Sequence, residues 1–212
     1  MRPVIIASIT LGLAVGVFSV AFGVGAVSAG ASVAQACVMS LLVFTGATQF
    51  SAVSVIGAGG STSAALGGAL LLAARNGVYG LTMSRRLSGP LGRRLIAAQL
   101  TLDESTAMSA AQSDPDAQRT AFWITGISIY VFWNLGTLIG ALAGSAIDPQ
   151  KFGLDAAFPA AFVAMVWPLL HNARGRLAAG LGAVICVVLI PFVPVGIPIL
   201  CAALAVLVGV PR

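Results

Sequence analysis

The stretch SAALGGALLLAARNGVYGLTM, residues Ser63–Met83, decides how the rest of the chain is interpreted. Its one charged side chain, Arg75, lies two residues from its middle and is followed by Asn76. About 20 apolar residues in a helix cross the hydrocarbon core of a bilayer, so the run is long enough to span one. An arginine at that depth costs roughly 2.5–3.5 kcal/mol on insertion scales and mostly faces a protein interior or a water-filled path. The run therefore predicts a membrane-spanning helix that carries a functional charge.

The composition of the whole chain agrees with this interpretation. Of 212 residues, 58% are hydrophobic and 8% are charged, whereas a soluble domain carries about 25% charged residues. This excludes an ordinary soluble domain and predicts a single transmembrane domain over residues 1–212. The net charge of +5 comes from arginines at the ends of apolar runs. Such placement is typical of membrane orientation, so we expect no nucleic-acid partner.

The apolar runs predict an all-α integral membrane protein, a polytopic helical bundle of about seven transmembrane segments in the plasma membrane. The second span is interrupted in its middle, and the last two are short, so whether they cross fully stays open. The first run exceeds the roughly 7–15 apolar residues of a signal-peptide core, so we expect it to be retained. The predicted spans are Val4–Val27, Val33–Ile56, Ser63–Met83, Thr120–Ala143, Leu154–Leu170, Leu177–Ile190 and Ile197–Val210.

The positive charges predict which side each end of the chain occupies. With seven spans, an outside N-terminus and an inside C-terminus place eight arginines in the cytoplasm and leave two cations outside, as the positive-inside rule requires. The inner set is Arg85, Arg86, Arg93, Arg94, Arg119, Arg174, Arg176 and Arg212, and the outer set is Arg2 and Lys151. Residues 84–118 then form a cytoplasmic loop with one short interfacial helix over Leu95–Met108, ended by Pro115.

The interruption of the second span reads Thr45-Gly46-Ala47-Thr48-Gln49. Glycine and hydroxyl residues inside a span allow local unwinding, and the freed backbone groups can bind a substrate or an ion. Alternatively, the small residues only allow close packing and the Gln49 amide bonds a neighbouring helix. Both interpretations remain open at this point.

Arg75 and an acidic pair are the charges that could carry chemistry. Arg75 lies eight residues before Met83, or about 12 Å of helix, and its side chain tilts toward the helix N-terminus, away from the nearer water. This favours an interior partner or a bound carboxylate over snorkelling. Asp103 and Glu104 are adjacent and belong either to a solvated helix or to a site for a proton or an amine at the inner mouth.

The remaining polar and aromatic residues indicate packing and not catalysis. Gly136, Gly140 and Gly144 form a GxxxGxxxG pattern that lets another backbone approach closely. The lone His171 is typical of an interface, and no catalytic set, phosphate loop or metal cluster is visible, so we expect no enzyme, cofactor or metal. The aromatic residues predicted at interfaces or in packing are Trp123, Tyr130, Trp133 and Trp167, and the cysteines predicted as small buried hydrophobes are Cys37, Cys186 and Cys201.

Five blocks in this order resemble the AzlC family of branched-chain amino-acid exporters. They are Leu42–Val53 with Thr45-Gly46-Ala47-Thr48-Gln49-Phe50, Leu70–Leu81 with Arg75-Asn76 followed by Arg86-Leu87, Leu102-Asp103-Glu104-Ser105, Trp133–Gly144, and Gly153-Leu154-Asp155 to Pro159-Ala160. Leu102 stands where the family has threonine, and Asn76 and Gly77 differ from its common residues. These departures put the identity of the substrate in doubt.

The resemblance implies export of branched-chain or related apolar amino acids, with a small multi-span subunit of the AzlD type as partner; a homo-oligomer is left open. Apolar side chains of the first, second and fourth spans would contact the aliphatic tail. The alternative is an assembly subunit that binds no substrate. The predicted transport path is Gly46, Thr48, Gln49, Arg75, Asn76 and Asn134, and the predicted gate or proton-coupling pair is Asp103 and Glu104.

Overall fold

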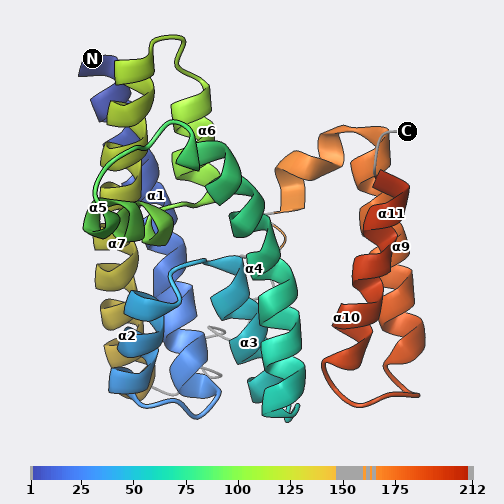
Figure 1. Ribbon diagram of the computed structural model, residues 1–212. Helices are drawn as coiled ribbons and strands as arrows, with labels where there is room; N and C mark the ends of the chain where they lie inside the picture. Colours follow the sequence, from blue (N-terminus) through green and yellow to red (C-terminus); the bar gives the residue numbers. More distant parts are fainter. Residues whose placement is uncertain (1, 147–159, 161–162, 164–165, 210–212) are drawn as a thin grey trace.

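The computed structural model describes residues 2–146, 160, 163 and 166–209, and these parts are helices and the turns between them (Figure 1). The predicted all-α class is confirmed. The predicted fifth span, Leu154–Leu170, falls largely outside the described residues. The elements are α1 (Arg2–Ser28), α2 (Val33–Leu42), α3 (Ala47–Gly57), α4 (Thr62–Ser84), α5 (Leu91–Gln99), α6 (Asp103–Ala110), α7 (Pro115–Ala146), η3 (Trp167–His171), α9 (Ala173–Leu189), α10 (Ile197–Ala202), η4 (Ala203–Ala205) and α11 (Val206–Gly209).

Helices α1 and α7 form the most extensively packed pair of helices in the described structure. They have 27 and 32 residues and, within the described ranges, are the two that are both long and apolar enough to cross a membrane. Residue numbers increase in the same direction along both helices where they touch. The Thr125 hydroxyl donates to the Ser8 hydroxyl at 2.8 Å, and further along Gly144 packs on the backbone of Val24. The two helices therefore run parallel. The GxxxGxxxG pattern predicts close packing either within the chain or against a partner, and in the structure it packs α7 on α1.

The predicted second span is a re-entrant pair of half-helices and not a crossing. α2 starts with a capping box in which the Ser32 hydroxyl accepts from the Gln35 amide at 3.2 Å. The chain reverses before α3 at Gly46, whose φ of 54° lies in the left-handed region that glycine adopts without steric cost. Gly57 at the far end of α3 returns to Ala29, because a Cβ built on Gly57 would lie 3.2 Å from the Ala29 Cβ. Both ends of the pair therefore lie at one end of the bundle.

The predicted single helix over Leu95–Met108 is in fact two, α5 and α6, and Pro115 does not end it. Pro115 is instead the first residue of α7, a position where its missing N–H is not needed. The Asp114 carboxylate caps this start by accepting from the Ala117 amide at 2.8 Å. The two helices α5 and α6 pack beside α7 (Figure 1), and α6 begins halfway along α4.

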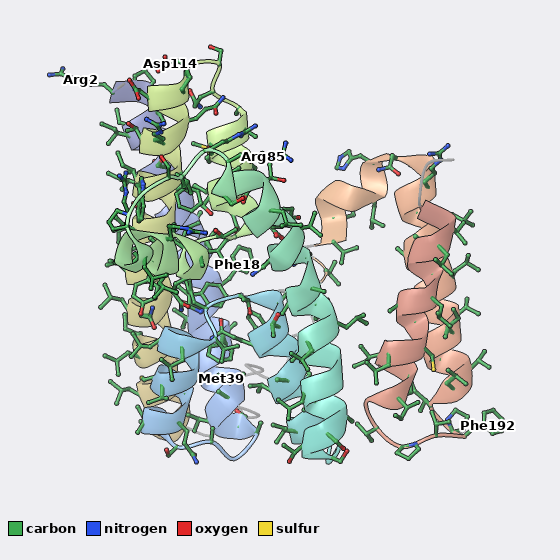
Figure 2. All side chains as sticks on the ribbon, viewed as in Figure 1. Arg2, Phe18, Met39, Arg85, Asp114 and Phe192 are labelled. Carbon is green, nitrogen blue, oxygen red and sulfur yellow. The ribbon has the colours of Figure 1, made fainter. Side chains whose placement is uncertain are left out.

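The turns of the two half-helix pairs meet inside the bundle. The Gln99 amide at the end of α5 donates to the carbonyls of Leu41 and Leu42, at 3.0 and 3.3 Å, and so caps the end of α2. The α2–α3 pair enters the bundle from the end near Ala29, and the α5–α6 pair enters it from the opposite end, near Asp114, so that their turns meet about halfway along the bundle (Figures 1 and 2). Each pair leaves an unwound turn at mid-depth, where the bundle can hold a ligand.

The predicted placement of Arg2 and Arg119 on opposite sides is wrong. Because α1 and α7 are parallel, both residues lie at the same end, and the Arg119 guanidinium bonds the Arg86 carbonyl there at 3.2 Å. The turn after α9 lies at the other end, since a Cβ built on Gly196 would meet Ala64 at 2.6 Å, so α9 also begins at the arginine end. The prediction failed because it counted α2–α3 as a full crossing.

We call the end of the bundle that carries Arg2 and Asp114 (Figure 2) the arginine end. The opposite end, where Phe192 lies, carries no charged side chain in its described turns 29–32, 58–61 and 190–196. The described arginines of the arginine end are Arg2, Arg85, Arg86, Arg119, Arg174 and Arg176, and Arg93 and Arg94 lie further in, on α5.

Candidate substrate-binding site

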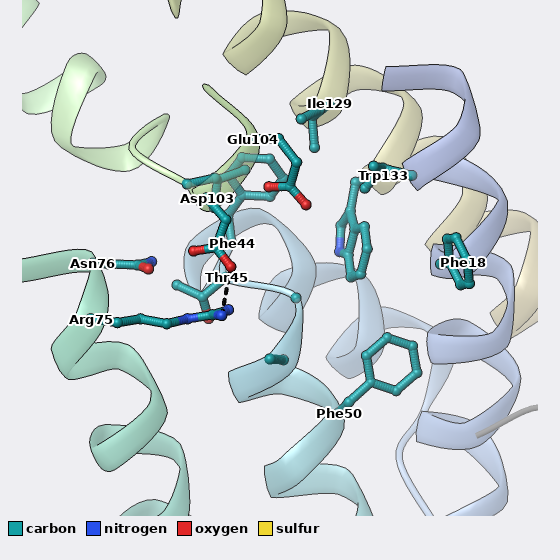
Figure 3. Close-up of a pocket in the computed structure, with 14 residues that line it drawn as sticks. Phe18, Phe44, Thr45, Phe50, Arg75, Asn76, Asp103, Glu104, Ile129 and Trp133 are labelled. Carbon is teal, nitrogen blue, oxygen red and sulfur yellow. Dashed lines mark ion pairs between the residues drawn. The ribbon is translucent and has the colours of Figure 1, made fainter. Parts of the chain in front are cut away.

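A cavity of about 150 Å³ lies where the two half-helix turns meet (Figure 3). Helices α1 and α7 form one wall, α4 forms another, and the turns before α3 and α6 close the space between them. The lining residues are Val15, Phe18, Phe44, Thr45, Gly46, Ala47, Phe50, Arg75, Asn76, Leu102, Asp103, Glu104, Ile129 and Trp133. The cavity therefore combines an aromatic and aliphatic wall with three charged groups.

Arg75 pairs with Asp103 across the cavity, with 2.5 Å between the guanidinium Nη1 and the carboxylate Oδ2 (Figure 3). Their side chains are 35% and 37% exposed, so water screens the pair and each group remains accessible from the cavity. Arg75 Nε and Asp103 Oδ1 are buried without a partner among the described residues. The pair is thus joined by one contact, and this contact neutralises both charges.

Glu104 follows Asp103 on α6 and stands on the cavity wall opposite Arg75 (Figure 3). Glu104 is half-buried and directly follows the Asp103 carboxylate in the chain. A half-buried acid of this kind can exchange a proton for a ligand cation.

Gln49 and Thr48, both predicted on the transport path, are buried in α3 and do not line the cavity. The Gln49 side-chain oxygen Oε1 accepts from the Gly46 backbone amide at 3.1 Å, and its side-chain Nε2 donates to the Met39 backbone carbonyl at 3.4 Å. Gln49 thus ties the two half-helices together and holds the turn open. Asn134 also lies outside the cavity and bonds the Tyr130 carbonyl of its own helix at 2.8 Å.

Gly46, Arg75, Asn76, Asp103 and Glu104 are brought together, although they come from three separate segments. The apolar wall also draws on the first, second and fourth predicted spans, through Val15 and Phe18, Phe44 and Phe50, and Ile129 and Trp133. Sequence reasoning assigned Trp133 to packing or an interface. The available signal was its place beside Asn134 in a family block, but neither spacing nor hydropathy shows which way a buried indole points.

An all-helical chain with membrane-length apolar helices and a charged, partly apolar cavity at mid-depth belongs to the class of membrane transport proteins. The profile of the AzlC protein family matches residues 10–147, more than half of the chain. The protein therefore belongs to the AzlC family, a transporter family and not an enzyme family, and is an integral protein of the cell membrane.

Relatives with curated descriptions agree with this assignment. An uncharacterized membrane protein of Helicobacter pylori is 28% identical over 169 residues, which cover 79% of this chain and 74% of that protein. The branched-chain amino acid transport protein AzlC of Bacillus subtilis is 26% identical over 76% of this chain and 61% of its own length. The inner membrane protein YgaZ of Escherichia coli is 28% identical over 69% of this chain and 63% of its own length. No solved structure matches the chain significantly.

Proposed function

We propose that the protein is a secondary transporter subunit that exports branched-chain or related apolar amino acids across the cell membrane. The observation that carries the proposal is the cavity itself: fixed charges of both signs beside a wall of apolar side chains. An amino acid needs a cationic or N–H partner for its carboxylate, an anionic partner for its ammonium and an apolar surface for its tail. A cavity of about 150 Å³ is large enough for a benzene-sized group, which exceeds an isobutyl side chain.

Purified protein in vesicles tests this proposal. We expect saturable uptake or efflux of leucine, isoleucine and valine that competes among the three, with weaker competition by glutamate or lysine. A small AzlD-type subunit is our proposed partner, on the basis of the family resemblance, and vesicles are compared with and without it. An assembly subunit would bind no amino acid in either case, and a passive channel would give flux that does not saturate.

The arginine end provides an orientation for this transporter. The described arginines outside the cavity lie at that end or on α5, which enters the bundle from it, and positive charge accumulates on the cytoplasmic side of membrane proteins. We therefore propose that both the N-terminus and the start of α7 face the cytoplasm. The turn after Ser28, predicted inside when the second span was counted as a crossing, then faces outward.

We expect a thiol reagent that does not cross membranes to label Ser28→Cys in intact cells and to leave Ser113→Cys unlabelled until the membrane is opened. Both side chains are exposed, and Cys37, Cys186 and Cys201 are replaced beforehand. Ser28 ends α1 and Ser113 precedes α7, so the parallel pair places them at opposite ends. An N-terminus outside would reverse the result, with Ser113→Cys labelled and Ser28→Cys shielded in intact cells.

Glu104 provides the proposed coupling to protons. When ionised, the Glu104 carboxylate attracts the substrate ammonium, whereas the protonated, neutral carboxyl does not. Leucine binding should therefore strengthen as the pH rises through the pKa of Glu104. Protonation on the acidic side of the membrane would release the amino acid, as export driven by a proton gradient requires.

Glu104→Gln should bind leucine weakly at every pH and lose the pH-dependent step, because the amide does not titrate. Equilibrium binding of labelled leucine between pH 4 and about 8 measures this around the ordinary glutamate pKa. Asp114→Asn is the matched control, since Asp114 is exposed and lies away from the cavity. Asp103→Asn is measured in parallel, and an unchanged pH dependence in both cavity variants would remove the acidic pair from coupling.

A further inference from the structure

The two half-helices that begin at the cavity, α3 and α6, differ in the charge of their first turns. The first backbone N–H groups of a helix have no partner within it, and the helix dipole makes that end positive. In α6 this positive end is offset by Asp103 and Glu104, whereas the first turn of α3 carries no acidic residue. Only the N–H groups of α3, an 11-residue helix, therefore present an uncompensated positive end to the cavity.

Trp133 is a second and independent donor at the same place. Its side chain is 5% exposed, and its indole Nε1 is buried without a partner among the described residues. Figure 3 shows this nitrogen on the side of the ring that faces the cavity. The ring is fixed by a stack on Phe22, with centroids 6.3 Å apart, and by an edge contact with Phe50 at 6.1 Å. A buried N–H held in this way is a vacant site for an acceptor.

The indole and the start of α3 lie close enough to act on one ligand. A Cβ built on Gly46, the residue that precedes α3, would lie 3.5 Å from Trp133 Cη2, on the benzene ring of the same indole that carries Nε1. The Gly46 amide is already used by Gln49, so the free donors are the first backbone N–H groups of α3 and the indole. Arg75, in contrast, already has a carboxylate partner in Asp103.

We propose that the carboxylate of the transported amino acid binds at the start of α3, where it accepts from Trp133 Nε1 and from the first free backbone amides of the helix. Arg75 remains paired with Asp103 and does not hold the substrate, and Glu104 takes the ammonium. This inference rests on the proposed transport function and deepens it. It assigns the substrate class as α-amino monocarboxylic acids with a small apolar side chain, and it makes the carboxylate obligatory.

Trp133→Phe tests this by removing the N–H and keeping a ring. Purified protein is titrated with leucine and with 3-methylbutylamine, which is leucine without its carboxylate. The wild type should bind the amine more weakly than leucine. The variant should bind leucine roughly tenfold to a hundredfold more weakly, the usual effect of a lost hydrogen bond to a charged group, and should bind the amine as the wild type does. Trp123→Phe is the control, because Trp123 is on the same helix, also has an unpartnered indole nitrogen and does not line the cavity.

The outcomes separate the carboxylate site from the transport function. A wild type that binds no apolar amino acid contradicts the proposed function. A wild type that binds leucine, with Trp133→Phe binding it equally well, contradicts the carboxylate site alone. An equal loss of leucine and amine binding in Trp133→Phe, or an equal loss in Trp123→Phe, would mean that the indole only supports packing and would also overturn the inference.

Discussion

We expect Arg75→Gln to abolish leucine transport while the protein still inserts into the membrane. The substitution leaves Asp103 without its cation beside Glu104, and two adjacent uncompensated carboxylates then face the half-enclosed cavity. Arg75 is one-third exposed, so the loss of stability is modest, at the roughly 1 kcal/mol of a screened pair. The loss of function should be far larger, because the cavity is left with two carboxylates and no cation. Efflux of labelled leucine from cells, with membrane protein levels measured alongside, gives the result.

The double variant Arg75→Gln, Asp103→Asn separates two roles for the arginine. If Arg75 only neutralises Asp103, removal of both charges restores leucine binding to purified protein. If Arg75 holds the substrate carboxylate, the double variant binds no better than Arg75→Gln alone. We expect restored binding, since the α3 start and Trp133 supply the donors. Full export by a well-inserted Arg75→Gln protein would remove the arginine from the site altogether.

We expect Gly140→Leu to prevent the protein from folding. A side chain at Gly140 would overlap the backbone carbonyl of Val20 on α1, and backbone cannot move aside as a flexible side chain can. Overpacking of a core costs about 1–3 kcal/mol and occasionally more, and we expect a cost at or above the upper figure here. Gly180→Leu on α9 is the control, because nothing lies within 4 Å of a Cβ built there. The yield of monodisperse protein after detergent extraction measures both, and equal yields would contradict the packing role of α1 and α7.

Hydropathy was sufficient for the helical class and for the long helices α1, α4 and α7, because each is a continuous apolar run. The break at Gly46 was also visible, since glycine and hydroxyl residues inside a span signal local unwinding. What hydropathy does not encode is direction. A half-helix that returns at Gly57 and one that continues across have the same composition, and this ambiguity reversed the predicted side of the N-terminus.

Some residues of the candidate site could likewise be predicted from the sequence, and others could not. Arg75, Asp103 and Glu104 could be singled out because charge is rare in this chain. Gln49 and Asn134 could not be told from cavity residues, because a buried amide serves equally to bind a ligand or to tie two helices, and the structure gives them helix partners. Trp133 was assigned to packing because its distinguishing property, an indole nitrogen without a partner in the described part of the chain, arises only in the folded protein.

The central claim is that an apolar amino acid occupies the cavity between the two half-helix turns, and a protection experiment tests it most directly. Asn76→Cys places a thiol on the cavity wall, in a background without the native cysteines and in a variant shown to transport leucine. The rate of its alkylation in the purified protein is measured with and without leucine, beside the exposed control Ser113→Cys. We expect leucine to slow alkylation of Asn76→Cys saturably and to leave Ser113→Cys unaffected. No protection at Asn76→Cys by leucine, isoleucine or valine in this transporting variant would show that the substrate binds elsewhere.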